Sequence, residues 1–345
     1  MSQSPIKNQG SLGHSSWSLS KYMDHFGALP IIIVFFALIG VYIVFAPMVF
    51  LHWPIYNSFL ITIPPMLILA LGLTIVIAAG EIDLSFPAVI SFSGFLFAYC
   101  SHDLGLPWLG FVAAIAGGAL VGVVNGWLIA ILGIPSIIIT IGTSFFWGGV
   151  ATVLSGGLSY ALQDITGSLI ACLFSGTLLG IPAEALWAIG IAVFVWVLLN
   201  RHRFGEHILF IGDSQHVAKV VGINTVRERI KLFTLMGVLA GFSGFLITID
   251  NLSYFPTQGQ GLLLSALAAV FIGGTSVFGG AATVAGSFFG ALIIGMLDAG
   301  IVAIGVSGFW VEVIVGLVFV IAVVLHTGLG DPVRVSALKR RFFFK

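Results

Sequence analysis

Two carboxylates, Glu81 and Asp83, interrupt a long apolar stretch within GEIDLSFPAV, residues 80–89. A charged side chain at the centre of a bilayer-spanning helix costs roughly 2.5–3.5 kcal/mol on insertion scales. These acids therefore either reach water at a membrane face or line a wet break inside the protein. Asp83, with Ser85 and Pro87 after it, also has the pattern of a helix start, an N-cap carboxylate followed by proline in the first turn. The motif predicts either a helix cap at the water boundary or a wet, protein-lined break.

Catalytic chemistry finds no support in the sequence. It contains no GxxxxGK[ST] phosphate-binding loop, no HExxH and no CxxC. The eight histidines lie mostly in termini or loops, and Cys100 and Cys172 lack metal-type spacing. We therefore expect no catalytic residue, no metal site, no cofactor bound by this chain and no ATP hydrolysis within it.

The composition identifies the kind of protein that surrounds the two acids. Of the 345 residues, 59% are hydrophobic and only 8% are charged, and the mean hydropathy is +1.16. A soluble domain carries about 25% charged residues. The chain is therefore predicted to be an all-α polytopic membrane protein. Its formal net charge of zero gives no indication of a nucleic-acid partner.

Apolar runs long enough to cross a bilayer need roughly twenty residues each. The sequence predicts about ten, at residues 29–50, 57–79, 85–101, 108–132, 136–154, 181–200, 232–250, 262–280, 282–304 and 310–326. They form a membrane domain, residues 29–326, between an N-terminal tail, 1–28, and a basic C-terminal tail, 327–345. The short run 85–101 and the glycine-interrupted run 262–280 fit the pattern least well.

The basic residues give these spans an orientation. All 13 Lys and Arg residues fall in the N-terminal tail, the long loop 201–231 or the C-terminal tail. With about ten spans, these three segments lie on one side of the membrane. The positive-inside rule makes that side the cytoplasm. Both termini and the loop 201–231 are therefore predicted to be cytoplasmic.

A second interruption lies at FIGGTSVFGGAATVAGSFFGAL, residues 271–292. Like GEIDLS, it follows an apolar run with glycine and small polar residues and then a helix spaced by small residues. If the two correspond, spans 2–5 and 7–10 would form an inverted repeat. Small-residue spacing is also a common helix-packing device, which leaves a chance likeness open. The motif glycines are Gly273, Gly274, Gly279 and Gly280.

The long loop contains GDSQHVAKVVGI, residues 212–223. Asp213 or Ser214 would cap a short helix, and Gly222 would end it. So short a helix is marginal alone and would gain stability by docking on another protein. The alternative is a solvated cytoplasmic turn.

Together, GEIDLS, RFGEHILFIGDSQHVAKVVGI and LAAVFIGGTSVFGGAATVAGSFFGALIIGML resemble the permease subunits of bacterial ATP-binding-cassette (ABC) importers for simple sugars of the ribose, xylose and arabinose type. These permeases belong to the branched-chain amino-acid permease superfamily. The likeness covers roughly residues 57–326 and implies a type II-like importer fold in the inner membrane. The family usually has glycine where Glu81 stands, and we therefore expect Glu81 to face solvent.

The resemblance also implies partners. The helix Asp213–Val220 would be the coupling element that docks on a cytoplasmic ATPase subunit, which would hold Mg-ATP, and Ala218 is expected to face that subunit. An extracytoplasmic solute-binding protein, a second permease copy or paralogue, and membrane lipid complete the expected partners. The coupling residues are Gly212, Asp213, Ser214, Gln215, Ala218 and Gly222.

The implied activity is import of a small polar solute, a monosaccharide or related polyol. Under this reading Asp83 has either a capping role or a role in gating or the solute path. The alternative function is a stand-alone secondary carrier or channel. Its weakness is the scarcity of ionisable groups within the spans, where only Asp298 and Glu312 look deep. Side chains suited to a sugar path are Asn57, Asn125, Thr140, Trp147, Asn251, Tyr254 and Trp310.

Overall fold

The computed structural model describes residues 28–329, and most of this range is helical. The predicted tails, 1–28 and 327–345, lie outside the described residues except at their inner ends. The helices are α2 (Leu29–Phe45), α3 (Pro47–Phe50), α4 (Trp53–Thr62), α5 (Pro64–Ala78), α6 (Phe86–His102), α7 (Pro107–Leu132), α8 (Ser136–Leu154), α9 (Leu169–Ser175), α10 (Ala183–Arg201), α11 (Arg203–Asp213), α12 (Gln215–Val220), α13 (Thr225–Asp250), α14 (Leu262–Ile272), α15 (Val284–Ala303) and α16 (Val311–Leu329). The short elements are η1 (Gln163–Ile165), η2 (Gly308–Trp310), β1 (Tyr160–Ala161), β2 (Thr177–Leu178), β3 (Ile181–Pro182) and β4 (Ser253–Tyr254).

Some of these helices reach membrane-spanning length and others do not. Within residues 28–329, five helices are long and apolar enough to cross a membrane, namely α7, α8, α10, α13 and α15. Helices α4 and α5 qualify as a pair, bent by 48° where they join. Helices α2, α6, α14 and the segment Gly308–Val324 are shorter apolar helices. The polytopic helical class is therefore confirmed, while the count of about ten spans stays a prediction.

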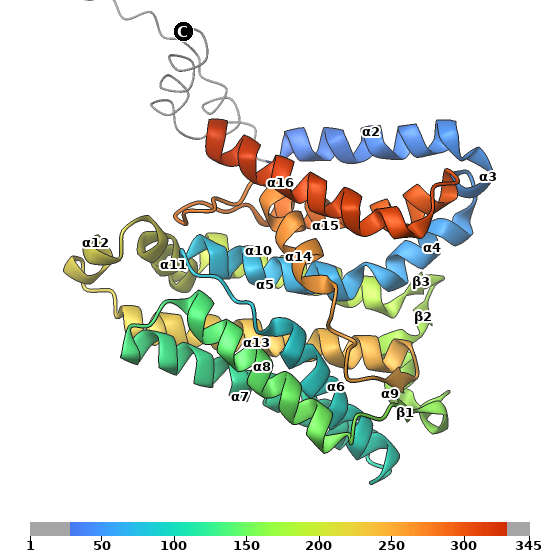
Figure 1. Cartoon of the computed structure of the whole chain (residues 1–345), viewed down its shortest axis with the longest axis horizontal. Coiled ribbons are helices and arrows are strands. Elements are labelled where there is room, and N and C mark those ends of the chain that lie inside the picture. Colours follow the sequence, from blue (N-terminus) through green and yellow to red (C-terminus); the bar gives the residue numbers. More distant parts are fainter. Residues whose placement is uncertain (1–27, 330–345) are drawn as a thin grey trace, which may run out of the picture.

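Helix α5 is the centre of the bundle, and all 15 of its residues are buried. It packs against α10, α13, α14 and α15, so protein encloses it from several directions. Figure 1 shows this middle layer between an upper layer containing α2 and α16 and a lower layer containing α7 and α8. The apolar character of α5 therefore serves contacts within the protein.

Helix α7 packs closely along α13, and glycine residues make this close approach possible. A Cβ atom on Gly122 would collide with the Phe233 carbonyl oxygen, and one on Gly237 would collide with the Gly118 carbonyl oxygen. Small residues at such positions allow two backbones to approach closely within a membrane. The long helix α13 is thereby fixed against α7 near the middle of its length.

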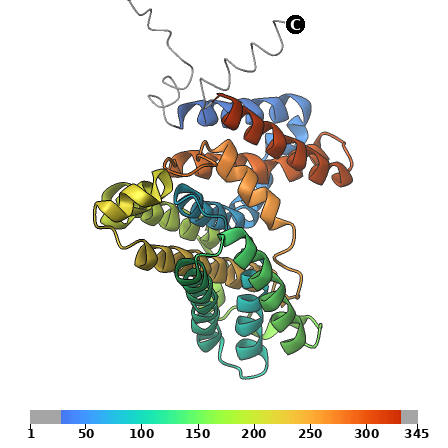
Figure 2. The same ribbon diagram turned by 60° about the vertical axis from the view of Figure 1, so that its left-hand side comes forward.

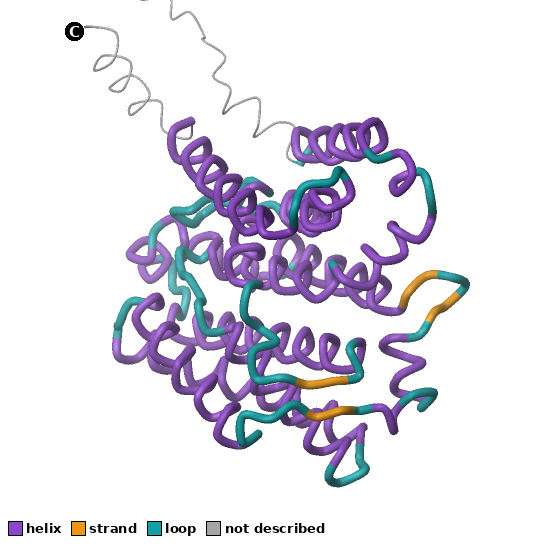
Figure 3. The backbone as a smooth tube through the Cα atoms, turned by 45° about the vertical axis from the view of Figure 1, so that its right-hand side comes forward, coloured by secondary structure: helices purple, strands orange, loops and turns teal. Residues whose placement is uncertain are grey.

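The two ends of the bundle differ. Helices α11 and α12 lie at one end, where α11 packs on the bundle and α12 projects from it (Figures 1 and 2). The strand pairs lie at the other end, which Figure 3 turns toward the viewer. There β1 pairs with β4, with Tyr160 opposite Tyr254, and β2 pairs with β3. Segments 155–182 and 251–261 therefore meet at the end away from α12.

Two expectations about helix limits need correction. The run 262–280 is helical only to Ile272, because Gly273 and Gly274 end α14 there. The loop 201–231 is largely helical, since α11 fills its first part and α13 begins at Thr225 instead of residue 232. Asn224 caps α13 by accepting a hydrogen bond of 3.0 Å from the Arg227 N–H. The basic residues of that segment are thus held on ordered helices.

Candidate functional site where the broken helices meet

The chain turns sharply at Gly80, between α5 and α6. The Gly80 N–H donates to Ile77 O and the Glu81 N–H donates to Val76 O, the two hydrogen bonds of a Schellman helix end. Gly80 has φ +74°, a conformation that costs glycine little. Residues 81–85 then lead into α6, which begins at Phe86.

Asp83 anchors this segment from a buried position. It is only 3% exposed, and its Oδ1 accepts hydrogen bonds from the Ser85 N–H at 2.7 Å and the Ser85 hydroxyl at 2.6 Å. Asn125 of α7 donates to Ser85 Oγ at 2.8 Å. Burial raises the pKa of the Asp83 carboxyl, and the hydrogen bonds from Ser85 oppose that rise. The prediction that Asp83 caps α6 at the water boundary is therefore wrong. The N-cap residue of α6 is Ser85, and Asp83 is buried inside the protein.

The break between α14 and α15 begins in the same way. The Gly274 N–H donates to Phe271 O and the Thr275 N–H donates to Val270 O, again the Schellman pattern, with φ +85° at Gly274. The segment ends where the Thr283 side chain caps α15 by accepting a 3.1 Å hydrogen bond from the Gly286 N–H. Both breaks thus begin at a glycine-terminated helix, but only the second ends at a helix with a side-chain cap, because the N-cap residue of α6, Ser85, makes no such hydrogen bond.

The three motifs singled out in the sequence meet at this end of the bundle. The Gly280 N–H donates to Ala78 O at 2.9 Å, which joins the second break to the end of α5. A Cβ atom on Gly212 would collide with Ala78 O, and one on Gly279 would lie 2.9 Å from Gly80 N. Gly80 of GEIDLS, the glycines of GGTSVFGG and Gly212, near the end of α11, therefore pack backbone against backbone.

The loop helix itself differs from its predicted form. Asp213 is the last residue of α11, and Ser214 caps α12 by accepting a hydrogen bond of 3.4 Å from the Val217 N–H. Gly222, with φ +88°, follows the end of α12 as expected. Ala218 is completely buried within this chain, so the expectation that it faces a partner is wrong. The exposed residues of α12 are His216, Val217, Lys219 and Val220.

Arg229 connects α12 to the first break. Its Nη2 lies 2.7 Å from Glu81 Oε1 and donates to Gln215 Oε1 at 3.2 Å. The side chains of Glu81 and Arg229 are only 7% and 17% exposed. Glu81 therefore does not face solvent, and its expected exposure is wrong because a buried cation pairs with it. Sequence analysis took Arg229 only as one of the basic cytoplasmic residues, and nothing in the spacing linked it to Glu81.

Three of the predicted solute-path residues lie near the first break or along its helices. Thr140 donates to Ser136 O at 2.8 Å, and Ser136 Oγ accepts a hydrogen bond of 3.1 Å from the Ile82 N–H. Asn125 is held by Ser85, and its Oδ1 is buried with no hydrogen-bond partner in the described part of the chain. Trp147 of α8 packs on Phe92 of α6, with ring centroids 4.8 Å apart.

The other candidates are scattered. Asn57 is half-buried on α4, Trp310 is exposed in η2, and Asn251 is exposed at the end of α13. Tyr254 is buried in β4 at the end of the bundle that holds the strands. The single chain therefore does not bring all these residues around one site.

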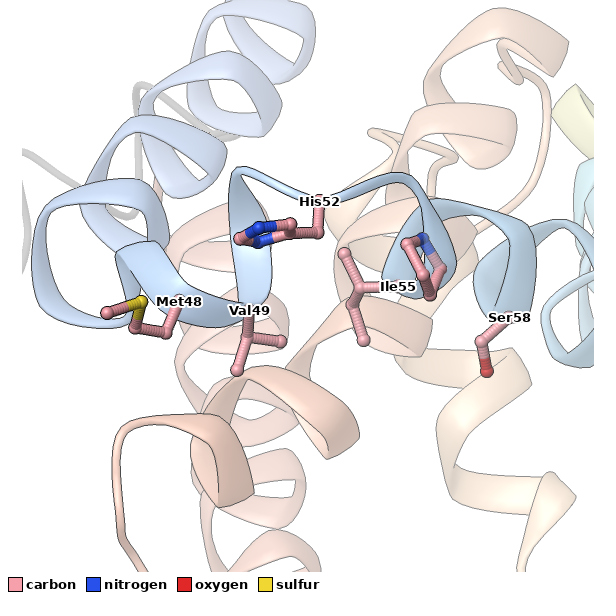
Figure 4. Close-up of a pocket in the computed structure, with 6 residues that line it drawn as sticks. Met48, Val49, His52, Ile55 and Ser58 are labelled. Carbon is pink, nitrogen blue, oxygen red and sulfur yellow. The ribbon is translucent and has the colours of Figure 1, made fainter.

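A surface hollow of about 520 Å³ lies at the turn between α3 and α4. Figure 4 shows Met48, Val49, His52, Ile55 and Ser58 around it. None of the predicted site residues lines it. Across residues 28–329, no three His, Cys, Asp or Glu side chains are grouped as a potential metal site.

Comparison with known proteins identifies a family for this arrangement. Residues 55–323 match the family model described as the permease component of the branched-chain amino acid transport system. The chain is 35% identical over 262 residues to the ribose import permease of Bacillus subtilis, covering 75% of this chain and 80% of that protein. It is 29% identical over 328 residues to the fructose import permease of Rhizobium meliloti, covering 89% and 88%. It is 30% identical over 273 residues to the autoinducer 2 import permease of Photorhabdus luminescens, covering 74% and 78%. No solved structure matches the chain.

Proposed function

The chain belongs to the branched-chain amino acid transport permease family, and on that premise we propose that it carries a monosaccharide or related polyol through the membrane. It is a multi-pass inner-membrane permease of an ABC importer for sugars. The observation that carries the proposed solute class is extended similarity to permeases named for ribose and fructose import. ATP hydrolysis is assigned to a separate subunit that binds Mg-ATP.

The docking site for that subunit is assigned to α12. This helix stands at the end of the bundle (Figure 2) and exposes Val217 and Val220, which are 50% and 74% accessible. Two exposed valines on a short cytoplasmic helix suit an apolar groove on a partner protein. The buried Ala218 fixes the opposite side of the helix to this chain.

We assign both termini to the cytoplasm and about ten membrane crossings to the chain. In support, the basic segment 201–231 lies beside the turns at Gly80 and Gly280, which the ten-span topology places on the same side. The inverted repeat stays a proposal from sequence alone, because the matching Schellman ends of α5 and α14 lie at the same end of the bundle, whereas equivalent helix ends in an inverted repeat lie on opposite sides of the membrane. A solute-binding protein would then meet the opposite end, and a second permease would complete the solute path.

A stand-alone carrier is the weaker alternative. Ion-coupled carriers commonly use ionisable residues that face the interior of the bundle. Asp298 and Glu312, the two acids that looked deep in the sequence, are both exposed on this chain. Family membership and the exposed docking helix both favour an ATP-driven subunit instead.

Reconstitution tests this function. The permease, its ATPase subunit and its solute-binding protein would be placed in vesicles and supplied with radiolabelled ribose, fructose and a polyol panel. We expect uptake of at least one sugar that requires ATP and the binding protein. Uptake that continues without the ATPase subunit would favour a secondary carrier and overturn the proposal.

Two matched substitutions test the docking surface. Val220→Trp adds bulk on α12 and should reduce co-purification of the ATPase subunit at least several-fold. Val153→Trp adds the same bulk at an equally exposed valine (79% exposed) at the end of α8 and should leave co-purification unchanged. Equal retention of the ATPase subunit by both variants would remove α12 from the docking surface.

A further inference from the structure

A single guanidinium nitrogen joins the docking helix to the first break. Arg229 Nη2 contacts Gln215 Oε1 on α12 and Glu81 Oε1 between α5 and α6. Arg229 itself belongs to the first two turns of α13, so three separate segments meet at one side chain. Among residues 28–329 its Nε is buried without a hydrogen-bond partner, and the two contacts of Nη2 hold the group in place.

Burial makes this bridge stiff. Glu81 and Arg229 are 7% and 17% exposed, and water therefore screens their attraction little. Arginine presents several donors in a planar fork, which suits simultaneous contact with a carboxylate and an amide oxygen. If Gln215 moves, the guanidinium must either follow it, which lengthens the contact with Glu81, or stay, which lengthens the contact with Gln215.

Glu81 leads directly into the hydrogen-bonded segment of the break. The next residue, Ile82, donates its N–H to Ser136 Oγ at the start of α8. Asp83 then accepts from Ser85, which in turn accepts from Asn125 on α7. The segment 81–85, which Arg229 contacts through Glu81, is thus hydrogen-bonded to α7 and α8.

We propose that Arg229 is a positioning residue that transmits movement of α12 to the segment 81–85 through its joint contact with Gln215 and Glu81. The proposal rests on α12 being the ATPase docking helix. When the ATPase subunit moves α12, the guanidinium carries Glu81 with it, and the hydrogen bonds of Ile82 and Ser85 pass the shift to α8 and α7. The bridge thereby links ATP hydrolysis to the helices around the first break.

The test measures sugar molecules taken up per ATP hydrolysed, using the reconstituted complex with ribose and fructose as probes. Glu81→Gln removes the charge from the pair, and Arg229→Gln removes the fork. We expect each to lower the ratio of transport to ATP hydrolysis by at least threefold while ATPase co-purification is retained. Arg227→Gln, an exposed arginine on the same helix turn, is the matched control and should keep the wild-type ratio.

A charge-reversed pair distinguishes a loss of coupling between α12 and the segment 81–85 from a loss of protein stability. Combining Glu81→Arg with Arg229→Glu restores an ion pair, and Gln215 can pair with either group because its amide both donates and accepts. The double variant should regain at least half of the wild-type ratio, whereas each single reversal should lose it.

The outcomes separate the bridge from the function on which it rests. A wild-type ratio in Glu81→Gln, or transport and hydrolysis falling in equal proportion in all variants, would overturn the bridge while leaving import intact. A wild-type complex that takes up no sugar would instead count against the proposed function.

Discussion

Asn125 on α7 donates a 2.8 Å hydrogen bond to Ser85 Oγ, and the Ser85 hydroxyl donates onward to Asp83 at 2.6 Å. This chain of side chains fixes the beginning of α6 to α7 inside the protein. Each member is nearly inaccessible to water. Because unpaired polar groups are costly in such surroundings, the network is sensitive to the loss of an acceptor but tolerant of its neutralisation.

Substitutions at Asp83 test this distinction. Asp83→Ala leaves the Ser85 N–H and hydroxyl without their acceptor and should destabilise the permease by about 1–3 kcal/mol. Asp83→Asn keeps an acceptor oxygen for Ser85, so it should retain most transport. Thermal unfolding at a fixed scan rate and sugar uptake at matched protein levels would measure both. A severe transport defect in Asp83→Asn at normal thermal stability would give this carboxylate a role beyond holding the break.

Gly212 should not tolerate a side chain. Gly212→Ala drives a methyl group into Ala78 O and Gly280 N, and overpacking of this kind costs about 1–3 kcal/mol. We expect a lower unfolding temperature and displacement of α11 and α12, detected as faster proteolysis of the loop 201–231. Gly142→Ala, on α8 where an added Cβ meets nothing within 4 Å, is the control. Equal stability of both variants would contradict the close packing at Gly212.

Bulk at Ala218 should damage the permease itself. Because Ala218 is completely buried in this chain, Ala218→Trp must displace α12 from α11 or α13. The variant should unfold at lower temperature even in the absence of the ATPase subunit. Val220→Trp, on the exposed side, should not change the unfolding temperature of the isolated permease. The opposite result, with Ala218→Trp stable alone, would mean that this residue faces outward.

Labelling of engineered cysteines checks the proposed orientation. Ser159 and Thr257 are both exposed near the β1–β4 pair, at the end away from α12. In a background with Cys100→Ala and Cys172→Ala, Ser159→Cys and Thr257→Cys should react with an impermeant maleimide added to intact cells. Lys219→Cys should react only in inside-out vesicles. Reaction of Lys219→Cys in intact cells would reverse the assigned topology.

Sequence patterns located helices more reliably than contacts. The prediction for α8, residues 136–154, agrees with its observed limits, since Pro135 precedes an uninterrupted apolar run. The run 262–280 was extended too far because averaged hydropathy does not register the backbone turn at Gly274. Helix α11 was missed in a segment read mainly for its charge.

The Glu81–Arg229 pair shows the limit more sharply. Each residue taken alone fits a cytoplasmic boundary, and only the packing of α13 against the end of α5 brings the two charges together. The glycine positions were more informative, because Gly80, Gly212 and Gly280 all belong to the motifs that the sequence analysis identified. The sequence did not predict that these three glycines lie in contact.

The enclosure of α5 has a consequence for how the protein is made. A membrane protein emerges from the ribosome from its N-terminus onward, so α5 is inserted before α10, α13, α14 and α15 exist. During that interval its surroundings are acyl chains, and its 15 residues must be soluble in them. The same residues later exchange lipid for side chains as the remaining helices arrive. The apolar sequence of α5 is therefore suited to two successive environments, the lipid around the nascent chain and the interior of the folded permease.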